Sequence, residues 1–151
     1  MSASRRLAEL DIVLPPVVPP TAVYVPAKKV GNLVFTSGQM PYEEGVLRTT
    51  GKVGDEVDVA RAQGLARACA INALAVIDKE VGIDSVVEVV KVLGFVASSA
   101  GFTGQPAVIN GASELLEEVF GAAGKHARSA IGVAELPMGA PVELEVIVAV
   151  A

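Results

Sequence analysis

The C-terminal run from His126 to Val150 constrains the fold more than any other part of this chain. From Val142 onward every second residue is apolar, and Glu143 and Glu145 stand between the first of them. Strand side chains point alternately to the two faces of a sheet, so this pattern is typical of a strand with one buried face. We therefore expect the chain to end in a strand that belongs to the core.

Length, composition and charge favour a single globular domain that does not bind nucleic acid. At 151 residues, with 52% apolar and 19% charged, the chain is predicted to form one domain, residues 21–151, behind an N-terminal arm, residues 1–20. Its one cysteine, Cys69, excludes an internal disulfide and is expected to be a small buried side chain. A net charge of −5 argues against nucleic acid as a partner.

The sequence indicates a cytoplasmic protein with no membrane partner. No apolar run reaches the roughly 18 residues that a membrane-spanning helix needs, and no signal-peptide core is visible. The first 20 residues are expected to hold a short amphipathic helix, residues 2–10, and then an extended segment, because four prolines between Pro15 and Pro20 cannot donate hydrogen bonds in a sheet. Short strands are expected next, at residues 22–25, 33–37 and 46–48.

The remaining elements predict an α+β fold. A helix is expected over residues 57–80, capped by Asp55 or Asp58, and a second over residues 105–120. Between them, residues 86–97 form a continuous apolar run, which favours a central strand covered on both faces. The order predicts one mixed sheet with two helices on one face. Since no segment is left to cover the other face, we expect the chain to form an oligomer through it.

Arg128 and Glu143 are the leading candidates for a functional site. An arginine among small and apolar neighbours is costly to bury unless it meets an anion. That anion is either Glu143 or Glu145, as a structural ion pair, or a carboxylate ligand. Glu143 is either a general base or a solvated strand residue. The only histidine, His126, has no second metal ligand at a suitable spacing, so no metal site is predicted.

The spacing of these two residues suggests a site built from two chains. If the last two strands pair as a hairpin, Arg128 lies at its far end and Glu143 near its turn, on the order of 20 Å apart. Other candidates remain open between packing and ligand binding: Asn110, Ser37, Tyr24 and His126, the last expected on the same strand face as Arg128.

Three motifs resemble the RidA/YjgF family of enamine and imine deaminases, which is also called endoribonuclease L-PSP. They are GNLVFTSGQMP at 31–41, VINGASELLEEVF at 108–120 and ARSAIGVAELPMGAPVELEVIVAV at 127–150. The resemblance implies a chorismate-mutase-like subunit in a barrel-like homotrimer with clefts between neighbours. It implies hydrolysis of small enamines or imines to 2-oxo acids and ammonia, without a metal or organic cofactor.

The resemblance also assigns residues. Arg128 would bind the carboxylate of an imino acid and Glu143 would act on the water, while the cleft would be lined by Tyr24, Ser37, Gly38, Asn110 and Ala130. Ala130 stands where the family often has cysteine, and the segment around Tyr24 departs from the usual family sequence. A non-enzymatic carboxylate-binding or regulatory protein is the alternative. RNA cleavage or translation inhibition fits the acidic charge least.

Overall fold

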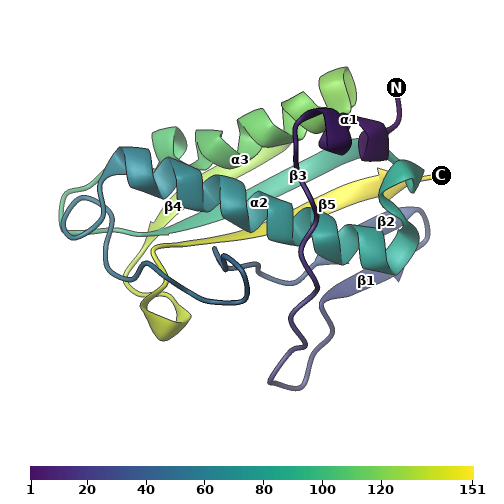
Figure 1. Ribbon diagram of the computed structural model, residues 1–151. Coiled ribbons are helices and arrows are strands. Elements are labelled where there is room, and N and C mark those ends of the chain that lie inside the picture. The colour runs from purple at the N-terminus through teal and green to yellow at the C-terminus, as the bar shows by residue number, and fades with distance from the viewer.

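A five-stranded mixed sheet is the central element of the molecule (Figure 1). The computed structural model describes residues 1–151. Strand β3 pairs in parallel with β4, and all other neighbouring strands are antiparallel. Across the sheet the order is β1 (Ala27–Val30), β2 (Leu33–Thr36), β5 (Val142–Val150), β3 (Val86–Ala97) and β4 (Ala127–Val133).

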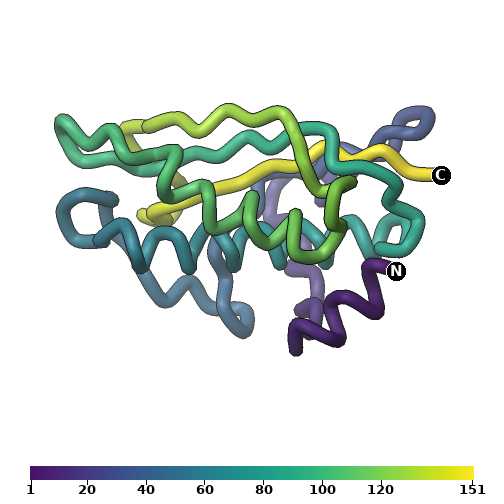
Figure 2. Tube along the Cα trace, turned by 90° about the horizontal axis from the view of Figure 1, so that it is seen from above, coloured from purple at the N-terminus to yellow at the C-terminus, as the bar shows by residue number.

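Two long helices, α2 (Val59–Val81) and α3 (Gln105–Phe120), lie on one face of the sheet (Figures 1 and 2). The Asp58 carboxylate caps α2 by accepting from the Arg61 backbone N–H at 2.7 Å. The helices approach closely where α3 has Gly111, because a Cβ there would overlap the Gln63 carbonyl oxygen. The predicted α+β arrangement, with two helices on one face, is confirmed. Three short 3₁₀ turns connect these elements: η1 (Ile83–Ser85) before β3, η2 (Gly121–Gly124) after α3 and η3 (Pro137–Gly139) before β5.

The core lies between the helices and the central strands β3 and β5. Side chains that alternate along β5 and β3 are buried there, among them Val142, Leu144, Val146, Val92 and Val96. No helix covers the opposite face, so the expectation that residues 86–97 are covered on both faces is wrong for a single chain. Exposed apolar side chains on that face include Val30, Phe35 and Ile131, at 57%, 39% and 45% exposure.

The last two strands do not form the predicted hairpin. Strand β3 lies between β4 and β5, and it pairs with both. The reason is α3, which carries the chain from the end of β3 back to the start of β4 as a parallel crossover. This places β4 at the edge of the sheet, and the segment containing η3 then leads the chain past β3 to β5.

The N-terminal residues form the predicted short helix and then an extended arm. Helix α1 (Ala3–Glu9) packs near α3, where Arg6 Nε donates to the Glu118 carbonyl at 2.8 Å. The arm then crosses the outer side of α2 (Figure 1). Two predicted strands are wrong. Residues 22–25 form bends and irregular chain, because Pro26 lacks a donor and pairing starts after it, and residues 46–48 contribute only an isolated bridge.

Candidate functional site

Arg128 lies on the edge strand β4 and reaches over α3. Its Nη1 donates to Asn110 Oδ1 at 2.8 Å and to Ser113 Oγ at 3.2 Å, and its Nη2 donates to the Pro106 carbonyl at 3.4 Å. None of these acceptors is charged, and Arg128 forms no ion pair with a carboxylate of its own chain. The ion pair with Glu143 or Glu145, one of the two alternatives from the sequence, is therefore absent within the chain.

The guanidinium of Arg128 keeps one edge unused. Arginine has five N–H donors, and three of them point at the neutral acceptors of α3. The Nε–H and one N–H of Nη2 have no partner. These two nitrogens lie along one side of the planar group, the geometry that binds a carboxylate through two parallel hydrogen bonds. Arg128 is thus held in place and remains open to an anion.

His126 takes part in the same cluster through Ser113. The His126 Nδ1 lies 2.6 Å from the Gly124 carbonyl, which can only accept, so Nδ1 carries the proton. In the neutral ring Nε2 then accepts from the Ser113 hydroxyl at 2.9 Å. Ser113 therefore donates to the histidine and accepts from Arg128, so one hydroxyl connects the two side chains. Ala130, next on this strand face, packs partly buried against the core.

A second group of candidate residues lines a cavity of about 480 Å³ between the proline-rich arm, α2 and the chain that follows β2. Tyr24, Gly38 and Glu143 all line it, together with the proline-rich arm and the turn at Met138. Ser37 stands beside this cavity, and its hydroxyl donates to the Val25 carbonyl at 2.6 Å. That bond holds the exposed segment that carries Tyr24 against the end of β2.

Glu143 is the one charged residue that lines the cavity. Burial raises the pKa of its carboxyl above the ordinary value, and the nearby Glu145 carboxylate adds to the rise. Gly38 makes room for it, because a Cβ at that position would overlap Glu143 Oε1. A half-buried carboxylate with a raised pKa is suited to accept a proton from water.

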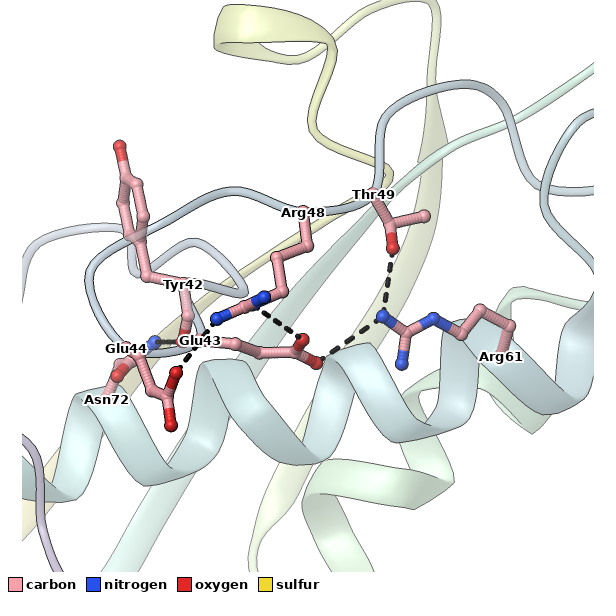
Figure 3. A network of polar contacts seen from close by, with 7 residues as sticks. All are labelled: Tyr42, Glu43, Glu44, Arg48, Thr49, Arg61 and Asn72. Atoms are coloured by element: carbon pink, nitrogen blue, oxygen red, sulfur yellow. Dashed lines mark hydrogen bonds and ion pairs between the residues drawn. The ribbon is translucent and has the colours of Figure 1, made fainter.

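The loop from residue 40 to residue 49 forms part of the cavity wall and is fixed to α2 at two points (Figure 3). Asn72 donates to the carbonyl oxygens of Met40 and Tyr42 at 2.9 and 3.1 Å. Arg61, nearer the start of the same helix, reaches Glu43 at 3.5 Å. Since both Asn72 donor hydrogens are used inside the protein, Asn72 shapes the wall and has no donor left for a ligand.

Arg128 and Glu143 do not meet within one chain. Arg128 stands opposite Val92 of β3 and Glu143 opposite Phe95, so they are three residues apart along the sheet and two strand spacings across it. These offsets separate the two backbones by about 14 Å. Arg128 points toward α3, whereas Glu143 alternates with residues buried beneath α2 and points to the opposite face. The two candidate residues therefore lie in separate places on one chain.

The sequence profile of the family described as Endoribonuclease L-PSP matches residues 17–150. The chain belongs to this family. Protein TCP17 of Trypanosoma cruzi is 42% identical over 147 residues, which make up 96% of this chain and 92% of TCP17. Among solved structures, Atu1372 of Agrobacterium tumefaciens superposes with a TM-score of 0.92 at 44% identity, covering 99% of this chain and 92% of that one. A putative endoribonuclease of Shewanella oneidensis reaches 0.95 at 27% identity, covering 99% and 100%.

Membership of the L-PSP family, the RidA/YjgF family that the motifs indicated, agrees with the fold. Sequence reasoning did not find Ser113, although it stands three residues after Asn110 and so shares its helix face. It also did not assign the arm to the cavity wall. Cys69 is buried, as expected, and burial raises the pKa of its thiol.

No three His, Cys, Asp or Glu side chains come together in a set that could hold a metal ion. None of the helices is long and apolar enough to cross a membrane.

Proposed function

We propose that this protein hydrolyses small reactive enamines or imines derived from amino acids, at a site shared between two copies of the chain in a homotrimer. One copy contributes Arg128 and Asn110, and the neighbouring copy contributes Glu143, Gly38 and Tyr24. The observation that carries the proposal is the Arg128 guanidinium, which neutral acceptors hold while one edge stays open. The uncovered apolar sheet face supports the assembly.

The chemistry follows from the two half-sites. The open edge of Arg128 binds the carboxylate of a 2-imino acid and so positions its C=N bond. Glu143 accepts a proton from water as the water oxygen bonds to the imine carbon, and it passes that proton to the nitrogen, which receives the C=N electrons. Glu143 then takes the hydroxyl proton of the carbinolamine as the C=O bond forms and gives it to the amino group, so that ammonia leaves with the C–N electrons and a 2-oxo acid remains. The raised pKa of Glu143 makes it a stronger base than an exposed glutamate.

The first experiment compares Arg128→Ala and Arg128→Lys with wild type, measuring ammonia release from freshly generated 2-aminoacrylate and 2-aminocrotonate. Two charge-assisted hydrogen bonds of about 1.5–3 kcal/mol each are lost in Arg128→Ala, so kcat/KM should fall by roughly two to four orders of magnitude. Arg128→Lys should recover only part, because an ammonium cannot bind side-on. Unchanged kinetics in Arg128→Ala would overturn the assignment.

A second experiment tests the shared site by mixing subunits. Arg128→Ala and Glu143→Gln are each expected to be inactive alone. Unfolded together in equal amounts and refolded, they should give about one quarter of wild-type activity, because a quarter of randomly formed interfaces of a cyclic oligomer pair the two intact residues. No recovery would show that both residues act from the same chain. Saturable binding of 2-oxo acids by wild type without turnover would favour a carboxylate-binding protein instead.

A further inference from the structure

The cavity beside Glu143 is larger than a three-carbon or four-carbon imino acid requires. Its volume is about 480 Å³. Pockets of roughly 300–1,000 Å³ accommodate ligands of drug size. An acid as small as 2-aminoacrylate would leave most of this space to water. The space that remains next to the reacting carbon is where the side chain of a substrate would lie.

The wall of this space is made by the proline-rich arm. Pro16, Pro19 and Pro20 line the cavity, and Val18 stands between them on the same wall. Prolines have a fixed φ and no backbone N–H, so this wall is stiff and offers few donors to a polar group. Val17, also in the lining, is packed against the core and ties the arm to the fold.

In the rest of the lining, the polar side chains of Gln39, Tyr42 and Asn72 already have partners within the chain. Met138 and Tyr42 stand there, and the Tyr42 hydroxyl lies 3.7 Å from the Met138 sulfur. Both donor hydrogens of Asn72 are taken by backbone carbonyls, as described above. Glu143 supplies the only charge. The remaining polar side chains of the lining are Thr21, Tyr24, Gln39, Tyr42 and Asn72, and they stand among prolines, valines, methionines and an alanine.

We propose that the preferred substrates are 2-imino acids with a bulky apolar side chain, branched aliphatic or aromatic, which packs between the arm and the turn at Met138. The inference rests on the proposed function and deepens it. In this arrangement the carboxylate lies at Arg128 of the neighbouring copy, the C=N bond lies at Glu143, and the side chain lies against Pro16–Pro20. The arm is then the part of the chain that determines specificity.

The test compares imino acids that an L-amino acid oxidase makes from alanine, 2-aminobutyrate, leucine and phenylalanine, with kcat/KM measured for the full chain. Each methylene buried against the wall should raise kcat/KM about fourfold, so the leucine and phenylalanine imines should exceed the alanine imine by more than tenfold. Val18→Ser should reduce this advantage. Val23→Ser is the matched control, because Val23 lies in the same segment, is fully exposed and does not line the cavity.

Three outcomes separate the inference from the function beneath it. A rising series that Val18→Ser flattens and Val23→Ser leaves unchanged supports the inference. Turnover that is equal across the series, or highest for the alanine imine, overturns the inference and leaves the deaminase proposal standing. Absence of turnover with every imine overturns the proposed function and this inference with it.

Discussion

Ser113→Ala tests whether the cluster on α3 positions Arg128 for its ligand. Ser113 accepts from Arg128 Nη1 at 3.2 Å and donates to His126 Nε2 at 2.9 Å. Removing the hydroxyl leaves Arg128 two of its three anchors, at Asn110 and at the Pro106 carbonyl. The guanidinium should then sample more orientations, and its open edge should meet a carboxylate less often.

The size of the effect follows from the bond that is lost. A partly exposed hydrogen bond of this kind contributes about 1 kcal/mol, which corresponds to about a fivefold increase in KM for imino acids. The value of kcat should stay within twofold, because the chemistry at Glu143 is not touched. Folding should be little affected, since alanine is about 0.5 kcal/mol better than serine in a helix and offsets part of the loss.

The assay is steady-state ammonia release over a range of substrate concentrations, with urea unfolding as the check on stability. Ser113→Thr keeps the hydroxyl and should restore a wild-type KM. A lower kcat with an unchanged KM, or a Ser113→Ala protein indistinguishable from wild type, would refute the reasoning. A thermal or urea midpoint far below wild type would point to a structural role and also count against it.

Three further perturbations test individual contacts. Glu145→Gln removes the like charge that adds to the raised pKa of Glu143, so the pKa of Glu143 should fall. In a plot of kcat/KM against pH, the acid limb should then move to lower pH, and an upward or absent shift would contradict this. Gly38→Ala should lower kcat about a hundredfold or more with the fold retained, because the atoms nearest the new methyl group belong to the Glu143 side chain, and a normal kcat would be the contrary result. Gly111→Ala should lower the free energy of unfolding by about 1–3 kcal/mol in urea titrations, because the methyl group meets backbone of α2.

Helices and strands whose apolar residues recur at a regular spacing were predictable from the sequence. Which strands lie next to one another in the sheet was not. The helices at 57–80 and 105–120 appear as α2 and α3 with ends shifted by a residue or two at most, because their caps and apolar spacing are local signals. The hairpin between the last strands was wrong because two adjacent strands in sequence need not be neighbours in a sheet. Only the crossover through α3 decides that β4 lies beyond β3, and no local pattern reports it.

The candidate residues were named from residue type, position and motifs, and their grouping came only from the fold. Tyr24, Gly38 and Glu143 are far apart in sequence, and they line one cavity because the segment before β1, the end of β2 and the start of β5 meet there. The role of Ser113 was hidden for the opposite reason. It is an ordinary helix residue until the parallel pairing of β3 and β4 brings Arg128 over it.

The separation of Arg128 from Glu143 is itself suited to the proposed chemistry. If the two met in one chain, an ion pair would occupy the open edge of the guanidinium and would lower the pKa of the carboxyl, which would weaken it as a base. Held about 14 Å apart and on opposite faces of the sheet, each keeps the property that the reaction needs. Arg128 stays available to an anion, and Glu143 keeps its raised pKa. Under the proposed function, the two properties are combined only where a second copy of the chain brings its own half-site to a shared substrate.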